Sequence, residues 1–461
     1  MHPLTLELQE VSHHIAATTM AANGNIAEDV KISLYMFLVI CPSIVGASPF
    51  GGRPEQIHLS WTGINTEMIV TWSTFNTTSQ STVEYGINQL NFAVNGTSTK
   101  FVDGGKEHRT QFIHRVKITE LQANQTYFYH CGSPDGWSAV YYFTTFQDGT
   151  DWSPKFAVFG DMGNINAQSL AALEEETQKG HFDAILHVGD FAYDFDSYEG
   201  VTGDEFMRQI EPVAAYLPYM VCPGNHENAY NFSHYKNRFT MPGYEQSQNL
   251  WFSWNIGPAH IISISTEVYF YINFGKQQMK NQWHWLHQDL EEATKPESRA
   301  KHPWIIVMGH RPMYCSNNDH DDCTTFESIV RTGYNGQYGL EKLFYKYGVD
   351  LEIWAHEHSY ERLWPVYDRE VYNGSSSEPY TNPKAPVHII TGSAGCQEKH
   401  DGFQPPFRPW SAFRAQDYGY TRMQIINGTH LYLEQVSDDK GGQVIDKITI
   451  IKDHHGPYGV V

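Results

Sequence analysis

The feature that most limits the fold of this chain is a series of short, nearly continuous apolar segments in its second part. These segments are residues 156–159, 184–188, 219–222, 261–264, 304–308, 351–354 and 387–390. Runs of this length are typical of strands that are buried on both faces of a sheet. Helical patterns over 166–179, 278–293 and 340–347 separate some of them. The pattern therefore predicts an α/β layered domain over residues 154–461, with a return to β structure over 420–451.

Residues 53–146 have a different pattern, in which apolar and polar residues alternate as they do in half-buried strands. Ile57–Trp61 and Met68–Trp72 are two examples. Leu121 followed by Tyr127 matches the tyrosine corner of immunoglobulin-type sandwiches. We therefore predict an all-β, fibronectin-III-like sandwich in this region.

Five of the apolar segments are followed at once by polar residues of the types that bind metals. The sequences are Gly160-Asp161-Met162, Gly189-Asp190-Phe191-Ala192-Tyr193, Gly224-Asn225-His226-Glu227, Met308-Gly309-His310 and Ala355-His356-Glu357-His358. In α/β folds, ligands bind outside the carboxyl ends of the strands, so these groups are expected at one edge. Carboxylates and imidazoles gathered there need cations to hold them. Two cations, with one carboxylate such as Asp190 bridging them, could activate water as hydroxide for attack on a phosphate ester.

The ordered motifs GDM, GDFAY, GNHE, VMGH and AHEHSYER resemble those of the purple acid phosphatases, in the long, plant-like form that also occurs in animals. The tyrosine in GDFAY is what other metallophosphoesterases lack. The resemblance covers residue 54 to the C-terminus. It implies a calcineurin-like metallophosphoesterase domain, a β-sandwich flanked by helices, after the fibronectin-III-like domain. It also implies acid phosphatase activity on phosphate monoesters, with a metal-bound hydroxide as the nucleophile.

The family pattern also implies which residues form the site. One Fe(III) would be held by Asp161, Asp190, Tyr193 and His358. A second, divalent metal (Fe, Zn or Mn) would be held by Asp190, Asn225, His310 and His356. His226 matches a histidine that binds the substrate phosphate and assists the leaving group, and His320 matches a second one. The plant enzymes have two adjacent histidines in that loop, whereas Asp319 occupies the first position here.

Two other functions are compatible with these residues. The same site could act on phosphodiesters, pyrophosphates or nucleotides. Alternatively, the chain could be a secreted binding protein with a vestigial metal site, although the presence of all seven ligand positions argues against decay.

Charge and the N-terminal segment indicate which partners and compartment to expect. A formal net charge of -21 disfavours nucleic acid as a partner. Small phosphate esters are the substrates that the predicted metal site and the resemblance imply. Residues 32–47 are apolar, are interrupted by Pro42 and end in small residues, so residues 1–47 are predicted to be a signal peptide region. A span of roughly 20 apolar residues is needed to cross a bilayer, and no stable membrane insertion is expected. An uncleaved anchor and a buried core helix are the alternatives.

Six Asn-x-Ser/Thr sequons support secretion to the extracellular space. They begin at Asn76, Asn95, Asn124, Asn231, Asn373 and Asn427. Cys315 and Cys323 bracket a polar loop and are the expected disulfide. His454 and His455, near the C-terminus, are predicted to be a surface pair.

Overall fold

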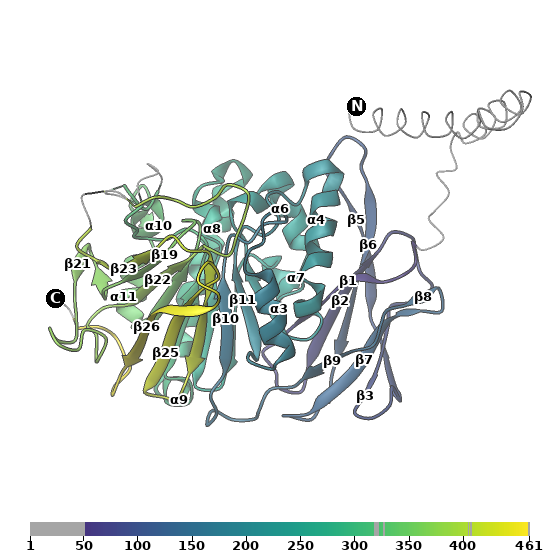
Figure 1. The fold of residues 1–461 in the computed structure, drawn as a ribbon, viewed down its shortest axis with the longest axis horizontal. Helices are drawn as coiled ribbons and strands as arrows, with labels where there is room; N and C mark the ends of the chain where they lie inside the picture. The colour runs from purple at the N-terminus through teal and green to yellow at the C-terminus, as the bar shows by residue number, and fades with distance from the viewer. Residues whose placement is uncertain (1–50, 318–321, 326–327, 404, 406–407, 460–461) are drawn as a thin grey trace, which may run out of the picture. The chain divides into compact units, whose positions relative to one another are not determined.

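The computed structural model describes residues 51–317, 322–325, 328–403, 405 and 408–459, which belong to one compact unit, Phe50–Val461 (Figure 1). The predicted signal peptide region 1–47, Asp319 and His320 lie outside the described residues. Among the residues described, no helix combines the length and the apolar character that crossing a bilayer requires.

The first part of the unit is a sandwich of two antiparallel sheets, as predicted. One sheet has the order β1-β2-β6-β5, formed by Glu55–Ser60, Met68–Thr74, Thr110–Ile118 and Thr97–Val102. The other has the order β4-β3-β7-β8, formed by Phe92–Asn95, Thr82–Gly86, Thr126–Ser133 and Gly136–Trp137, and β9 (Tyr141–Thr144) also pairs with β7. Trp72, Val83 and Tyr129 are buried between the sheets. The Tyr127 hydroxyl accepts a hydrogen bond from the Gln122 N–H at 2.9 Å, which confirms the tyrosine corner.

The second part contains two larger mixed sheets. The six-stranded sheet has the order β12-β11-β10-β24-β25-β26, formed by Tyr219–Cys222, Ala184–Val188, Lys155–Phe159, Gly419–Ile425, His430–Ser437 and Gln443–Ile451. The seven-stranded sheet has the order β13-β14-β15-β18-β22-β19-β23, formed by Phe252–Ile256, Ala259–Ser263, Trp304–Met308, Leu351–Trp354, Val387–Thr391, Tyr360–Leu363 and Ser411–Ala415. The seven apolar segments identified in the sequence all lie in these two sheets, which confirms the predicted fold class.

Strands of the seven-stranded sheet are buried on both faces, which explains why their sequences are almost continuously apolar. Ile261, Ile306 and Ile353 belong to the core that contains the strands of the six-stranded sheet. Their neighbours Ile262 and Val307 belong to a second core with residues of helices α8 (Lys276–Ala293) and α11 (Glu341–Tyr347). The sheet therefore packs on the other sheet with one face and on helices with the opposite face.

Two helices cover the outer face of the six-stranded sheet, where α3 (Leu170–Gln178) and α4 (Ser197–Gln209) lie against β10 and β11 (Figure 1). The helix predicted over 166–179 is shorter than expected, because it begins only at Leu170. Helices α4 and α6 (Ala229–Arg238) were not predicted: both are polar on average, and residues with left-handed backbone geometry interrupt each of them near its start. The remaining elements are α5 (Glu211–Ala214), η1 (Asn225–Glu227), α7 (Tyr244–Ser247), η2 (Glu267–Tyr269), η3 (Ile272–Phe274), α9 (Pro296–Lys301), α10 (Ile329–Thr332), β16 (Gly333–Tyr334), β17 (Gln337–Tyr338), β20 (Val366–Tyr367) and β21 (Glu370–Val371).

Candidate metal centre

The polar residues that follow the strands are brought together by the way the strands pair. Strands β10, β11 and β12 are mutually parallel, and so are β15 and β18. The carboxyl ends of parallel neighbours lie at the same edge of a sheet, so the residues after them approach one another. Gly189 permits a close approach: its φ is +84°, and a Cβ there would lie 2.5 Å from His310 Nδ1. A larger residue at position 189 would therefore displace His310.

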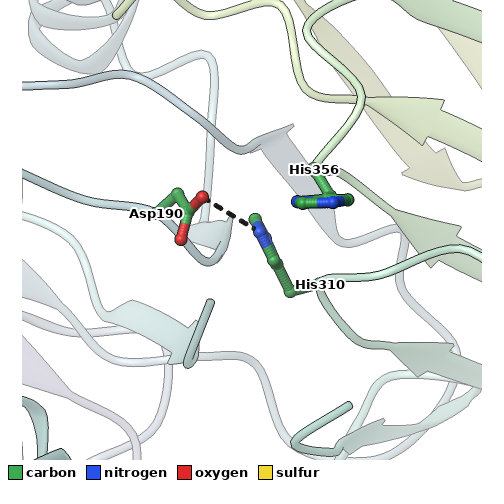
Figure 2. Close-up of side chains that lie close together, drawn as sticks. All are labelled: Asp190, His310 and His356. Carbon is green, nitrogen blue, oxygen red and sulfur yellow. Dashed lines mark ion pairs between the residues drawn. The ribbon is translucent and has the colours of Figure 1, made fainter. Parts of the chain in front are cut away.

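Asp190, His310 and His356 form one cluster, in which a ligand atom of each lies within 4.8 Å of those of the others (Figure 2). His310 Nε2 is 3.1 Å from Asp190 Oδ2 and 3.1 Å from Asn225 Oδ1. The other ring nitrogen of His310, Nδ1, lies 2.8 Å from the Val188 carbonyl oxygen, which fixes the plane of the ring. The structure thus places the four residues predicted for the divalent metal side by side.

Asp161, Tyr193 and His358 form a second cluster. The Tyr193 hydroxyl donates to Asp161 Oδ1 at 3.2 Å and lies 2.8 Å from His358 Nε2. His358 Nε2 is 3.6 Å from Asp161 Oδ1. The two clusters adjoin, because the His356 N–H donates to Asp161 Oδ2 at 3.0 Å.

His226 lies between the clusters and the surface. Its backbone N–H donates to Asp190 Oδ1 at 2.9 Å, and its Nδ1 is 2.6 Å from Asp194 Oδ1. Its Nε2 is 3.7 Å from Glu398 Oε1. Burial alone would lower the pKa of His226, but Asp190 and then Asp194 and Glu398 outweigh it and raise the pKa to about 11. The surrounding carboxylates therefore favour the cationic form of the ring, which can attract an anion.

The carboxylate of Glu227 supports the backbone of this region. It accepts hydrogen bonds from the N–H groups of Asp190 at 3.0 Å, Phe191 at 3.0 Å and Gly224 at 2.8 Å. These bonds tie the turn after β11 to the turn after β12. Sequence reasoning did not find Asp194, Glu398 or Arg311, whose Nη1 is 3.0 Å from His356 Nε2. No local pattern marks them, because their contacts join segments that are distant in the chain.

The electrostatics of the site favour bound cations. Burial would lower the pKa of His310, but Asp190 outweighs it and raises that pKa to about 10. Burial would likewise lower the pKa of His358, but Asp161 and Cys396 outweigh it and raise that pKa to about 12. Burial alone would raise the pKa of Asp190, and the imidazoles of His310 and His226 hold it well below its ordinary value. Without metals the buried carboxylate of Asp190 is balanced by the imidazoles of His310 and His226, and a donor set of carboxylates, imidazoles and an amide oxygen fits metal cations.

Cys315 and Cys323 form a disulfide with a Cα–Cα distance of 5.4 Å. Cys323 Sγ is 2.9 Å from Oε1 of Glu357, the residue between the candidate ligands His356 and His358. Among the described residues, Cys131, Cys222 and Cys396 are free and buried.

Comparisons with known proteins match the chain along most of its length. Residues 54–145 match the family model described as the purple acid phosphatase N-terminal domain, residues 154–360 match calcineurin-like phosphoesterase, and residues 385–447 match iron/zinc purple acid phosphatase-like protein C. The chain is 60% identical to acid phosphatase type 7 of Danio rerio over 417 residues, covering 89% of this chain and 94% of that protein. It is 54% identical to acid phosphatase type 7 of Homo sapiens over 407 residues, covering 87% and 92%.

The fold also matches a solved structure. Purple acid phosphatase PPD1 from yellow lupin (Lupinus luteus) superposes with a TM-score of 0.73 and 24% identity, covering 87% of this chain and 75% of that chain. The similarity to the animal proteins covers 89% and 87% of this chain, and it agrees with the resemblance that the five motifs carry. The chain therefore belongs to the purple acid phosphatase family and is an acid phosphatase of that type.

Proposed function

We propose that the protein hydrolyses phosphate monoesters at a binuclear metal site bridged by Asp190. Fe(III) would be held by Asp161, Asp190, Tyr193 and His358. A divalent Fe, Zn or Mn would be held by Asp190, Asn225, His310 and His356. The observation that carries the proposal is the position of Asp190 beside His310 and His356, in a site adjoining that of Asp161. When bound, the two cations would supply an activated water and neutralise charge on the phosphate.

The side chains around the metals have separate tasks in this proposal. Asp194 holds the ring of His226 in place, and the neighbouring carboxylates favour its protonated form, so it can bind the phosphate and stabilise charge on the leaving oxygen. Glu227 holds the turns that carry Asp190 and Asn225. His320 is a second candidate for leaving-group assistance from its place in the sequence, and it lies outside the described residues.

Metal content and substrate range test this function together. Asp190→Ala should lose both metals and all hydrolysis of p-nitrophenyl phosphate, because one carboxylate serves both ions. Asp453→Ala, a change at an exposed carboxylate, is the control and should keep both. An Asp190→Ala variant that retained two metals would refute the ligand assignment.

The unaltered protein distinguishes the alternative functions. Faster hydrolysis of bis-p-nitrophenyl phosphate or pyrophosphate than of monoesters would favour the alternative substrates. Protein that holds two metals but hydrolyses none of these substrates would favour a binding protein.

We also propose that the protein is secreted and glycosylated. The predicted signal segment supports this proposal, and so do the six sequons. Asn95, Asn124 and Asn427 are exposed, whereas Asn76, Asn231 and Asn373 are half-buried. The exposed three are therefore the preferred sites. Expression in animal cells should yield protein in the medium that shrinks on glycosidase treatment, and Asn→Gln changes at the exposed three should remove most of that shift. Unglycosylated protein confined to the cell would count against secretion.

A further inference from the structure

Arg311 directly follows the candidate ligand His310, and its side chain is fixed on several sides. Its Nε lies 3.1 Å from each carboxylate oxygen of Glu267, and its backbone N–H donates to Thr266 Oγ1 at 2.9 Å. The guanidinium lies over the ring of Phe270, with 4.4 Å from Cζ to the centroid. Arg311 is buried, with 9% of its surface exposed, and its carboxylate partner Glu267 is fully buried. The guanidinium is thus a buried cation with a defined position.

Within the described part of the chain, the Nη1 atom of Arg311 contacts Asp322 and His356. It donates to Asp322 Oδ2 at 2.9 Å and lies 3.0 Å from His356 Nε2. Arginine carries hydrogen-bond donors only, so His356 Nε2 must be the acceptor. The ring proton of a neutral His356 is then on Nδ1.

This hydrogen bond and a metal ion at His356 exclude each other. If the metal binds Nε2, it takes the lone pair that accepts from Arg311. If the metal binds Nδ1, the ring proton moves to Nε2. The N–H of Nε2 then points at the N–H of Arg311 Nη1, and two donors cannot form a hydrogen bond. The positive charge of Arg311 also repels a cation at the same imidazole. A carboxylate that accepts a hydrogen bond from a ligating histidine strengthens metal binding. A guanidinium donates a hydrogen bond and carries positive charge, so it should weaken metal binding at the same histidine.

We propose that Arg311 is a positioning residue that competes with the divalent cation for His356 and so lowers the affinity of the second metal site. The inference rests on the proposed ligand role of His356. When a metal enters, Arg311 gives up His356 but keeps Glu267 and Asp322, so no buried charge is left without a partner. The divalent ion is therefore exchangeable, and the guanidinium keeps His356 in place while the ion is absent.

The affinity of the second site can be measured without activity. Iron-loaded protein is titrated with Mn(II), and free Mn(II) is followed by electron paramagnetic resonance. Arg311→Gln should bind Mn(II) more tightly by on the order of tenfold, since the competing donor and the charge are both removed. Arg331→Gln is the matched control, because Arg331 is also buried and pairs with Glu341 at 2.9 Å. Its affinity for Mn(II) should be unchanged, and unchanged or weaker binding in Arg311→Gln would overturn the proposal.

Two further measurements separate the possible failures. His356→Ala should weaken Mn(II) binding strongly, and an unaltered affinity would refute the ligand assignment rather than the role of Arg311. In the wild-type metal-free protein, ¹⁵N correlation spectra of the histidine rings report the tautomer directly, with the His356 signal assigned from its absence in His356→Ala. A proton on Nδ1 is expected. A proton on Nε2 would overturn the proposal even if Arg311→Gln does not fold.

Discussion

Tyr193 shows how the chemistry of one side chain can be tested. Its phenol is buried against Asp161 and His358, and burial followed by the charges of Asp161 and Asp190 raises its pKa well above the ordinary value. In the metal-free protein the phenol is therefore protonated. In the proposed site it would hold Fe(III) as a phenolate, and phenolate-to-iron charge transfer would absorb visible light.

Tyr193→Phe should therefore lose the visible absorption of the iron-loaded protein while iron remains measurable by elemental analysis. Tyr271→Phe is a suitable control, because the Tyr271 hydroxyl donates to the Asn225 carbonyl oxygen at 3.3 Å and is not part of the proposed iron site. If Tyr193→Phe kept an unaltered spectrum, Tyr193 would not be an iron ligand.

A buried histidine in the sandwich makes stability depend on pH. His114 contacts Thr74 Oγ1 at 2.8 Å and Ser81 Oγ at 2.8 Å, and it stacks on Trp72 with 5.0 Å between centroids. Burial, and then the charge of Arg115, lower its pKa to about 4. The unfolded chain takes up a proton near pH 6.5, whereas the folded chain does so only near pH 4. The stability contributed by neutral His114 is therefore complete above pH 6.5 and is lost as the pH falls toward 4.

The free energy of unfolding, measured in urea from pH 7 to pH 4, should fall by about 3 kcal/mol because of this one group. His114→Gln should be less stable at pH 7 but should lose correspondingly less on acidification. His284→Gln, at an exposed helix position, should leave the pH dependence as it is. A slope unaffected by His114→Gln would contradict this interpretation.

At the level of elements, one carboxylate connects strands, a helix and the C-terminal segment. Asp350 precedes β18 and accepts from the Ile305 N–H of β15 at 2.8 Å and from Arg299 of α9 at 3.1 Å. It also accepts from Lys452, and His455 Nδ1 lies 3.2 Å away. The prediction of a surface pair was therefore wrong for His455, since its side chain is 6% exposed and bonded to a fully buried carboxylate.

Asp350→Asn should lower the free energy of unfolding by about 3 kcal/mol, because it leaves buried cations without their counter-charge. Burial alone would raise the pKa of Asp350, but Lys452, Arg299 and His455 hold it well below its usual range. Its contribution is therefore present above about pH 4 and is lost below it. Urea titrations at pH 7 measure the loss, with Glu297→Gln at an exposed helix position as the control. A loss under 1 kcal/mol would mean that the ion cluster is not stabilising.

For the whole molecule, the contacts between the sandwich and the phosphoesterase domain predict joint unfolding. Thr240 Oγ1 accepts from Thr71 Oγ1 at 2.9 Å and from Arg115 Nε at 3.0 Å. Asp103 Oδ2 lies 2.6 Å from His234 Nε2, with both side chains buried. Such contacts are lost together when either domain unfolds, so differential scanning calorimetry should show one transition. Two separate transitions would contradict this coupling. Asp103→Asn should lower the midpoint of the single transition rather than split it.

The sequence by itself determined the layers and the candidate ligands, because both depend on local patterns. A run such as Trp304–Met308 suits a strand buried on both faces of a sheet, and a polar residue that follows such a strand is expected at the sheet edge. Helix α6 escaped prediction since most of its residues are polar, and tertiary contacts such as that of His234 with Asp103 hold it in place.

Only the tertiary structure decided which side chains from distant parts of the chain contact one another. Asp194 reaches His226, Arg311 reaches His356, and Asp350 reaches His455 across 105 positions of the chain. These contacts depend on how strands from separate parts of the chain pair and on which rotamers their packing allows. A single sequence contains no local signal for either, whereas strand periodicity and strand-end chemistry can be read within a few residues.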